Sequence, residues 1–376
     1  MHAYSRSCDS AGQLVHAGIG ECVLLENATQ AMDAVAASVS VGSGTSVLIF
    51  STSYGSVKRC AASLCQKTKS TLVEVPVCFG EAEAHPSTFL KPLETALRAE
   101  SDCGRSVSLA VLDHVTSPTA VVLPVLEMAR MCKAYGVKRV AVDGAHAPGL
   151  LEVSSRALDA AGVDYWWGNL HKWCFVPRGV ALLRAAPGAP RDELQNPTVC
   201  HFTNEPLQWQ FFMCGTNDQS KFLCVDAAMR YAEMELGGFS KIAEYSKDLA
   251  QWGAWCLRRA FTDRASKSKC SAKVGAGADA RSLAFAQLAP ADMCVSMAVV
   301  ETPLKMRYFL HPGRRAELTS RGAADADVVP RLAGSSGDTG SGSDESGSTW
   351  RDAPDVSVQL AVATDPMLAE RIARVI

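Results

Sequence analysis

The chain has 376 residues, of which 48% are hydrophobic and 20% are charged, and its formal net charge is -2. This composition is that of a globular protein with a sizeable core, and the near-neutral charge gives no electrostatic basis for binding nucleic acid or an anionic membrane surface. No apolar run approaches the ~20 residues of a membrane-spanning helix, and the N-terminus lacks a signal peptide's hydrophobic core, so we expect a cytoplasmic protein that binds no membrane.

The fourteen cysteines are scattered along the chain, and no two of them form a Cys-x-x-Cys pair. The sequence therefore predicts no metal site and no thioredoxin-like motif. A chain of this length and hydrophobic content does not need disulfides to fold. We interpret the cysteines as small buried hydrophobic residues in a reducing compartment.

Short apolar runs alternate with amphipathic stretches from about residue 20 to residue 185. They predict strands at 21–26, 46–51, 71–76, 107–113, 139–143, 163–167 and 179–184, with helices at 29–41, 56–67, 90–99 and 124–135. This alternation is typical of an α/β protein whose sheet is mostly parallel and carries helices on both faces. Ligands of such sheets bind beyond the carboxyl ends of the strands, so functional residues should follow strands.

The pattern becomes mainly helical after Asp218, with predicted helices at 221–235 and 239–260 separated by Gly237 and Gly238. We predict a large domain over residues 1–236 and a smaller C-terminal α+β domain over residues 237–376. Within the latter, Ser335–Ser348 contains only Ser, Gly, Asp, Thr and Glu. Such a composition cannot form a core, so we expect a flexible insertion at about 333–350.

The first candidate site follows the first predicted strand, where Leu24-Leu-Glu-Asn-Ala-Thr29 leads into a helix. A helix N-terminus offers free backbone N–H groups and a partial positive charge, so Asn27, Ala28 and Thr29 are candidates for binding a phosphate. The structural alternative is that Asn27 or Thr29 only caps the helix.

The second candidate is Val140-Ala-Val-Asp-Gly-Ala-His-Ala-Pro-Gly149, in which an apolar strand ends on Asp143 and His146 follows in a turn. A carboxylate at a strand end can pair with a protonated ring nitrogen. Pyridoxal 5′-phosphate needs such a partner, because protonation of its pyridine nitrogen makes the ring an electron sink. Alternatively, Asp143 is a turn former.

The third candidate is Val163-Asp-Tyr-Trp-Trp-Gly-Asn-Leu-His-Lys-Trp173, where Lys172 stands between His171 and Trp173. An apolar setting disfavours the charged amine, lowers its pKa and makes the neutral amine available for a Schiff base. The alternative is a lysine that extends along an aromatic side chain to the surface.

In this order the three segments resemble the class V aminotransferase family of pyridoxal-phosphate enzymes. Two further segments resemble its isopenicillin N epimerase-like subgroup, which includes the hercynylcysteine sulfoxide lyases of ergothioneine biosynthesis: Leu112-Asp-His-Val-Thr-Ser-Pro-Thr-Ala-Val-Val-Leu-Pro124 and Cys214-Gly-Thr-Asn-Asp218. The resemblance covers about residues 11–305. It implies a fold type I, PLP-dependent transferase-like α/β architecture.

The resemblance also implies roles for the candidate residues. Lys172 would form the Schiff base and then transfer the substrate's α-proton, and Asp143 would pair with the pyridine nitrogen. His146 would lie near the ring's phenolic oxygen. Thr29 and the N–H groups after Asn27, including that of Ala28, would bind the phosphate, assisted by His171.

Further roles concern the rim of the site and a second subunit. Tyr54 falls where the family places an aromatic ring stacked on the cofactor; a packing tyrosine at a helix start is the alternative. Thr116 or Ser117 would reach the phenolic oxygen. Gly215 and Thr216 resemble the turn that binds the phosphate of the neighbouring subunit, which implies a homodimer with its site at the interface.

Two positions depart from the family. The chain begins close to the first matching residues, so we expect the family's N-terminal segment with its Asn-His-Gly-type turn to be absent. Gln359 stands where the family has an arginine that binds the substrate carboxylate, and a neutral amide cannot replace that charged fork, at a cost on the order of 2–3 kcal/mol. Arg351 or Arg371 are the alternative ligands.

The resemblance thus implies an enzyme that binds pyridoxal phosphate and acts on a small amino acid, for which we expect a sulfur-containing one. We expect a C–S lyase resembling the hercynylcysteine sulfoxide lyases. The alternatives are an amino-acid epimerase resembling isopenicillin N epimerase, an aminotransferase, and a truncated, non-catalytic relative that keeps the cofactor site.

Overall fold

The computed structural model describes residues 2–79, 84–198, 200, 205–212, 214–267, 287–300 and 358–361. Residues 1–300 and 359–376 group into one compact unit, and residues 301–358 into another. Apart from Val358, the structural features discussed below lie in the first unit. Among the described residues, no helix is both long enough and apolar enough to cross a membrane.

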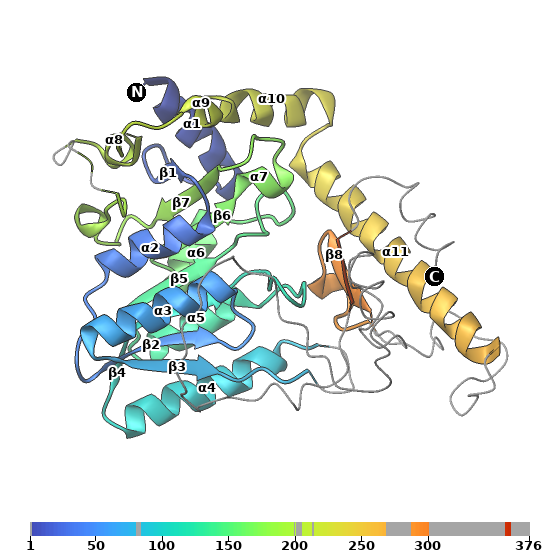
Figure 1. The fold of residues 1–376 in the computed structure, drawn as a ribbon, viewed down its shortest axis with the longest axis horizontal. Helices are drawn as coiled ribbons and strands as arrows, with labels where there is room; N and C mark the ends of the chain where they lie inside the picture. Colours follow the sequence, from blue (N-terminus) through green and yellow to red (C-terminus); the bar gives the residue numbers. More distant parts are fainter. Residues whose placement is uncertain are drawn as a thin grey trace, which may run out of the picture. The chain divides into compact units, whose positions relative to one another are not determined.

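A seven-stranded sheet forms the centre of this unit (Figure 1), with the strand order β1-β7-β6-β5-β4-β2-β3. Parallel pairing joins β3, β2, β4, β5 and β6, while β7 runs antiparallel to both β6 and β1. The strands are β1 (Cys22–Leu25), β2 (Thr45–Phe50), β3 (Thr71–Val75), β4 (Ser106–Asp113), β5 (Arg139–Asp143), β6 (Tyr165–Asn169) and β7 (Ala181–Ala185). The predicted α/β class with a mostly parallel sheet is confirmed, and each predicted strand overlaps an observed one.

Helices cover both faces of the sheet. They are α1 (His2–Gly12), α2 (Ala28–Ser38), α3 (Gly55–Thr68), α4 (Ser87–Asp102), α5 (Val125–Ala134), α6 (Ser155–Ala161), α7 (Leu170–Trp173), α8 (Leu207–Phe212), α9 (Ser220–Leu223), α10 (Val225–Glu235) and α11 (Phe239–Lys267), with short 3-10 turns η1 (Gln13–Val15), η2 (Arg191–Glu193) and η4 (Ala291–Met293). The helix predicted at 221–235 is interrupted at Cys224. The N-terminal helix α1 was not predicted.

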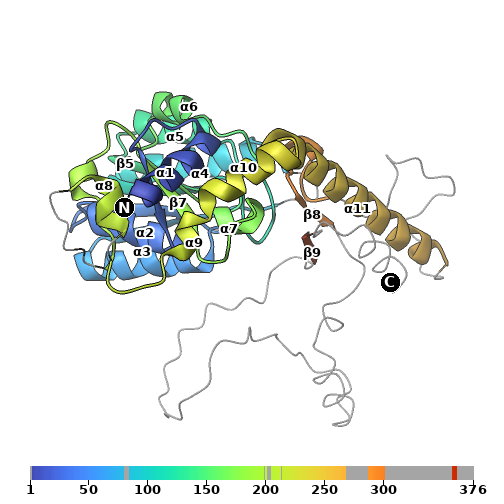
Figure 2. The same ribbon diagram turned by 90° about the horizontal axis from the view of Figure 1, so that it is seen from above.

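Two hydrophobic cores lie on opposite faces of the sheet, and each strand contributes to both. In β1, Cys22 and Leu24 belong to the core beneath α4, α5 and α6, while Val23 and Leu25 belong to the core beneath α2 and α3. Figure 2 shows α2 and α3 on one side and α5 and α6 on the other. This alternation follows from the two-residue period of a strand and explains why the buried strands read as continuous apolar runs.

Helix α1 protects the outer edge of the sheet. Strand β1 is an edge strand, so one side of its backbone lacks a neighbouring strand. The hydroxyl of the buried Tyr4 donates to the Leu24 carbonyl at 2.6 Å and accepts from the Leu24 N–H at 3.0 Å. Gln208 of α8 donates to the Cys22 carbonyl at 3.3 Å. These two side chains replace part of a missing strand.

The C-terminal predictions fall largely on residues that the structure leaves undescribed. The domain boundary after residue 236 stays a prediction, and the insertion at about 333–350, Arg351 and Arg371 lie outside the described residues. A short strand β8 (Met297–Val300) pairs with β9 (Val358–Ala361). Gln359 lies in β9, and its side chain is also outside the described part of the protein.

We expect Tyr4→Phe to lower the free energy of unfolding by about 2 kcal/mol, since it leaves the N–H and the carbonyl of Leu24 buried without a partner. Chemical denaturation followed by circular dichroism measures this change. The control is Tyr245→Phe, because Tyr245 is 52% exposed, and should change stability by less than about 0.5 kcal/mol. Equal effects of the two substitutions would show that the Tyr4 hydroxyl does not support β1.

Candidate active site

A cavity of about 350 Å³ lies at the carboxyl ends of β1, β2, β4, β5 and β6. Every residue that lines it closes one of these strands or follows it, as predicted for a parallel sheet. The lining consists of Asn27, Ala28, Thr29, Tyr54, Ser56, Val57, Asp113, Val115, Ser117, Asp143, Ala145, His146, Asn169, His171 and Lys172. The three candidate segments of the sequence therefore meet in one place.

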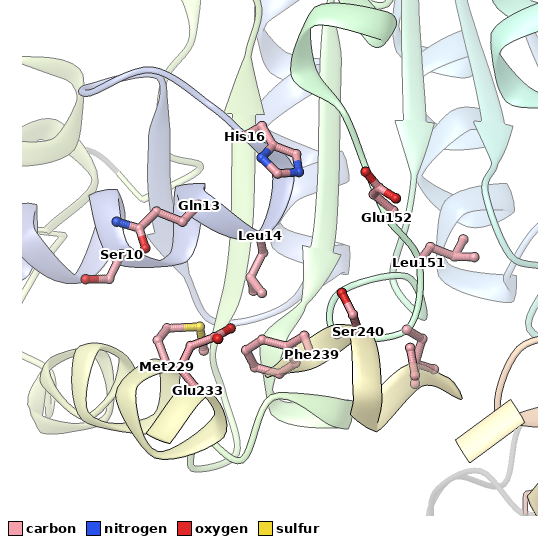
Figure 3. A pocket seen from close by; sticks show the side chains of 13 residues that line it. Ser10, Gln13, Leu14, His16, Leu151, Glu152, Met229, Glu233, Phe239 and Ser240 are labelled. Carbon is pink, nitrogen blue, oxygen red and sulfur yellow. The ribbon is translucent and has the colours of Figure 1, made fainter. Parts of the chain in front are cut away.

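A second cavity, of about 370 Å³, is lined by a different set of residues from α1, η1, the segment after β5, α10 and α11. Figure 3 shows Met229 and Glu233 of α10 beside Phe239 of α11, with His16 and Glu152 farther along the wall. Although it is slightly larger, this cavity contains no lysine and none of the predicted site residues. We therefore take the cavity at the strand ends as the candidate active site.

One corner of the active-site cavity is formed by the N-termini of α2 and α3. The Thr29 and Ser56 hydroxyls lie 2.9 Å apart, so the first turns of these two helices are neighbours. Both helix dipoles place partial positive charge at this corner. An anion such as a phosphate would find two helix N-termini and two hydroxyl groups there.

Part of the predicted phosphate segment also serves the local structure. The Asn27 side chain accepts the Gln30 N–H at 3.0 Å and caps α2, which was the structural alternative for this residue. The Ala28 N–H donates to Oδ1 of Asn169 at 2.9 Å, which ties the start of α2 to the end of β6. Thr29 is the member of the segment whose side chain faces Ser56.

Lys172 lies on the short helix α7, directly after β6. Its Nζ is 2.9 Å from Nε2 of His146, which follows β5. Desolvation lowers the pKa of the Lys172 amine, and the charge of Asp143 partly opposes that shift. The arrangement increases the fraction of neutral amine near neutral pH and keeps it in the same cavity as a carboxylate.

His146 is held as a neutral imidazole with one free position. Burial, and then the charge of Lys172, lower its pKa to about 4. When the Lys172 amine donates to Nε2, the neutral ring carries its proton on Nδ1. Nδ1 is buried, and no group within the described residues bonds to it. In that tautomer Nδ1 is a donor available to a ligand.

Two buried carboxyl groups close β4 and β5. Asp113 is 3% exposed and Asp143 is 5% exposed, and the two residues are partners in the register of the parallel pair. Burial is the main cause that raises the pKa of Asp143 to about 6 and that of Asp113 to about 7. The N–H of Ala145 donates to Asp143 at 2.9 Å, and Ser53 donates to Asp113 at 2.9 Å.

Three polar lining residues, Asp113, Asn169 and Ser56, were missed by sequence reasoning. The signal was present for Asp113 and Asn169, since each closes an apolar strand as Asp143 does. Ser56 gave no such signal. Its place on the wall depends on the packing of α2 against α3, which no local pattern predicts.

The remaining predicted residues lie at different depths. Tyr54 is 54% exposed at the start of α3 and lines the cavity. Nδ1 of His171 interacts with the Val180 carbonyl at 2.8 Å, which fixes the ring at the wall of the cavity.

The Thr116 hydroxyl points into its own turn, accepting the Val121 N–H at 2.8 Å. Of the two alternatives at that turn, Ser117 lines the cavity and Thr116 does not.

Gly215 and Thr216 are exposed and do not line the cavity of their own chain. The next residue, Asn217, donates to Glu26 at 2.7 Å, and Lys221 also donates to Glu26, at 2.6 Å. The turn is thus held beside the residue that precedes Asn27.

The sequence profile of the family described as aminotransferase class-V matches residues 2–266. The chain is 30% identical over 262 residues to an L-cysteine desulfhydrase of Arabidopsis thaliana, covering 69% of this chain and 51% of that protein. It is 29% identical over 198 residues to an isopenicillin N epimerase of Streptomyces clavuligerus, covering 53% of this chain and 46% of that protein. The chain thus spans about half the length of the curated relatives it matches.

The fold is shared with solved structures. The apo structure of a cysteine desulfurase from Thermococcus onnurineus NA1 superposes with a TM-score of 0.61 at 18% sequence identity, covering 85% of this chain and 72% of that one. At this identity the likeness concerns the architecture of the sheet and its helices.

We expect Asn169→Ala to lower the free energy of unfolding by about 2 kcal/mol, because it leaves the buried Ala28 N–H without an acceptor. The matched control is Asn217→Ala, which removes an exposed hydrogen bond to Glu26 and should cost less than about 0.5 kcal/mol. Urea denaturation of both variants gives the comparison. A small effect at Asn169 would mean that α2 keeps its start without this contact.

Proposed function

The chain belongs to the aminotransferase class-V family, and we propose that it is a pyridoxal-phosphate-dependent C–S lyase that acts on a sulfur-containing amino acid and carries its cofactor on Lys172. Pyridoxal phosphate is the cofactor of this family. The observation that carries the proposal is the single cavity in which Lys172, Asp143 and the start of α2 meet.

The residues present fit this cofactor at each of its functional groups. Thr29, Ser56 and the two helix N-termini suit a phosphate. The buried carboxyl of Asp143 suits a protonated ring nitrogen. The buried Nδ1–H of His146 lacks a partner within the described chain, and a phenolic oxygen would supply the missing acceptor. Lys172 offers the amine.

When bound, pyridoxal phosphate supplies an aldehyde that an amine can capture and a ring that accepts the electrons left by a departing proton. Asp143 would hold the positive charge of the ring nitrogen. Lys172 Nζ would take the α-proton of the substrate, and its lowered pKa favours the neutral amine that this step needs. His146 Nε2, at 2.9 Å, would orient that amine.

The substrate class rests on the relatives. Proteins named L-cysteine desulfhydrase match a large part of this chain, and the electron-accepting ring suits loss of a β-sulfur group from an amino acid. We therefore favour cysteine or a cysteine conjugate, with a hercynylcysteine sulfoxide as one candidate conjugate. The likeness to isopenicillin N epimerase favours a second candidate function, epimerisation at the α-carbon.

The proposal includes a homodimer in the cytoplasm. In support, Gly215 and Thr216 are exposed beside the phosphate corner, yet they do not line the cavity of their own chain. A turn in this position is available to the phosphate of a second copy. The active site would then be complete only in the dimer.

We expect the full chain to develop a visible absorption band when pyridoxal phosphate is added, and Lys172→Ala to lack the protein-linked band. The amine is the group that joins cofactor to protein, so its loss leaves a cofactor that gel filtration removes. The control is Lys91→Ala, since Lys91 is exposed on α4. An unchanged band in Lys172→Ala would reject the assignment of Lys172.

We expect turnover of a panel of L-cysteine, L-cystine and cysteine S-oxide conjugates to release pyruvate, because β-elimination of the sulfur group leaves an enamine that hydrolyses to pyruvate and ammonia. Pyruvate is measured with lactate dehydrogenase, and α-proton exchange into D₂O is followed by NMR. Exchange without pyruvate would favour epimerisation over lysis. A bound cofactor that no amino acid perturbs would contradict both activities.

A further inference from the structure

The two buried carboxyl groups at the strand ends cannot be treated separately. Asp113 and Asp143 close adjacent parallel strands in direct register, so their side chains project from the same edge of the sheet. Both line the active-site cavity. The His114 N–H donates to the Asp143 carbonyl at 2.8 Å, which continues the ladder and fixes the separation of the two strand ends. Adjacent strands lie ~4.8 Å apart, well within the range of strong charge coupling.

Different neighbouring groups stabilise the ionised forms of Asp143 and Asp113. Asp143 accepts the Ala145 N–H and feels the charge of Lys172 on α7. Asp113 accepts the Ser53 hydroxyl, and the charge of Lys58 on α3 lowers its pKa. His114 and His146 are neutral because burial lowers the pKa of each to about 4. They add no positive charge to the site at neutral pH.

Two buried carboxyls in this position share one negative charge over part of the pH range. Desolvation disfavours ionisation of both, and the first to ionise disfavours the second. Lys58 is engaged elsewhere, because its Nζ donates to Glu74 and to the Ser51 carbonyl, each at 2.7 Å. The higher pKa of Asp113, about 7, is caused by burial and then by the charge of Asp143.

We propose that Asp113 is a second carboxyl of the cofactor site, a positioning residue that keeps its proton while Asp143 is ionised and so leaves Asp143 as the one negative charge facing the ring nitrogen. This role rests on the proposed function, since it takes a cofactor with a protonated ring nitrogen as the ligand. The Ser53 hydroxyl holds Asp113 in place, and Ser53 lies in the loop that connects β2 to α3.

The test exploits an asymmetry between the two residues. Asparagine matches a neutral carboxyl in shape and can still accept the Ser53 hydroxyl, but it cannot carry the charge. At pH 6.5, between the pKa of about 6 for Asp143 and that of about 7 for Asp113, we expect Asp113→Asn to change the dissociation constant for pyridoxal phosphate by less than about threefold. Asp143→Asn should raise it by about tenfold or more. Both constants come from quenching of protein fluorescence. Equal damage from the two substitutions would overturn the proposal.

A second measurement uses the cofactor-free full chain. The pKa of Asp113 in the folded protein lies above its unfolded value, so the stabilisation due to its proton is complete below about pH 4 and is lost as pH rises to about 7. The ratio of the unfolding constant of the wild type to that of Asp113→Asn should therefore rise between about pH 4 and about pH 7, by up to about tenfold per pH unit. Above about pH 7 the ratio should be constant. A constant ratio of the two unfolding constants would refute the proton-holding role.

Two further variants separate this effect from general damage. Ser53→Ala keeps Asp113 but removes a hydrogen bond that lowers its pKa, so the pH dependence should persist and extend to higher pH. Ser101→Ala, a substitution of a non-titrating side chain at an exposed position on α4, should give a ratio to the wild type that does not change with pH. If the wild type binds no pyridoxal phosphate, the proposed function fails, while the stability profiles still decide whether Asp113 holds a proton.

Discussion

The parallel register of β4, β5 and β6 is the constraint on which the active site depends. Asp113 is paired with Asp143, and Asp143 with Trp167, so β4 and β5 end at the same level, two residues before β6 ends on Asn169. The Gly144 N–H donates to the Trp167 carbonyl at 2.8 Å and carries this ladder into the turn that holds His146. A shift of β5 by one residue in this register would turn the Asp143 side chain to the other face of the sheet and separate it from Lys172.

Close packing behind the cavity keeps these strand ends in place and removes water from them. A Cβ on Gly144 would lie 2.6 Å from the Trp166 ring, and one on Gly168 would lie 2.4 Å from Pro148. Only glycine allows these approaches. The buried indole of Trp166 donates in turn to His114 at 3.2 Å. The same burial that packs the strands raises the pKa of the carboxyls and lowers that of His146 and Lys172, so packing and acid–base chemistry have one cause.

The described part of the chain contains the residues proposed to bind the cofactor. Cofactor binding and substrate recognition depend on different parts of the protein. Phosphate and ring contacts come from strand ends and helix starts of the sheet, which are rigid and set by backbone register. Substrate recognition would come from a carboxylate ligand, for which Arg351 and Arg371 are the predicted alternatives to Gln359, and from a second subunit. Their chemistry decides between lysis and epimerisation, because both reactions begin with removal of the same α-proton.

The sequence by itself determined the strands, the order of the motifs and the family, because apolar runs, turn residues and the Asp143, His146 and Lys172 segments are local signals. It also predicted that the site residues follow strands, since that rule depends only on parallel pairing. Tertiary structure alone decided that Asp113 faces Asp143, that Ser56 meets Thr29, that Ser117 and not Thr116 lines the cavity, and that α1 seals the edge of β1. These contacts join residues distant in sequence through strand order and helix packing, and no local pattern encodes which elements become neighbours.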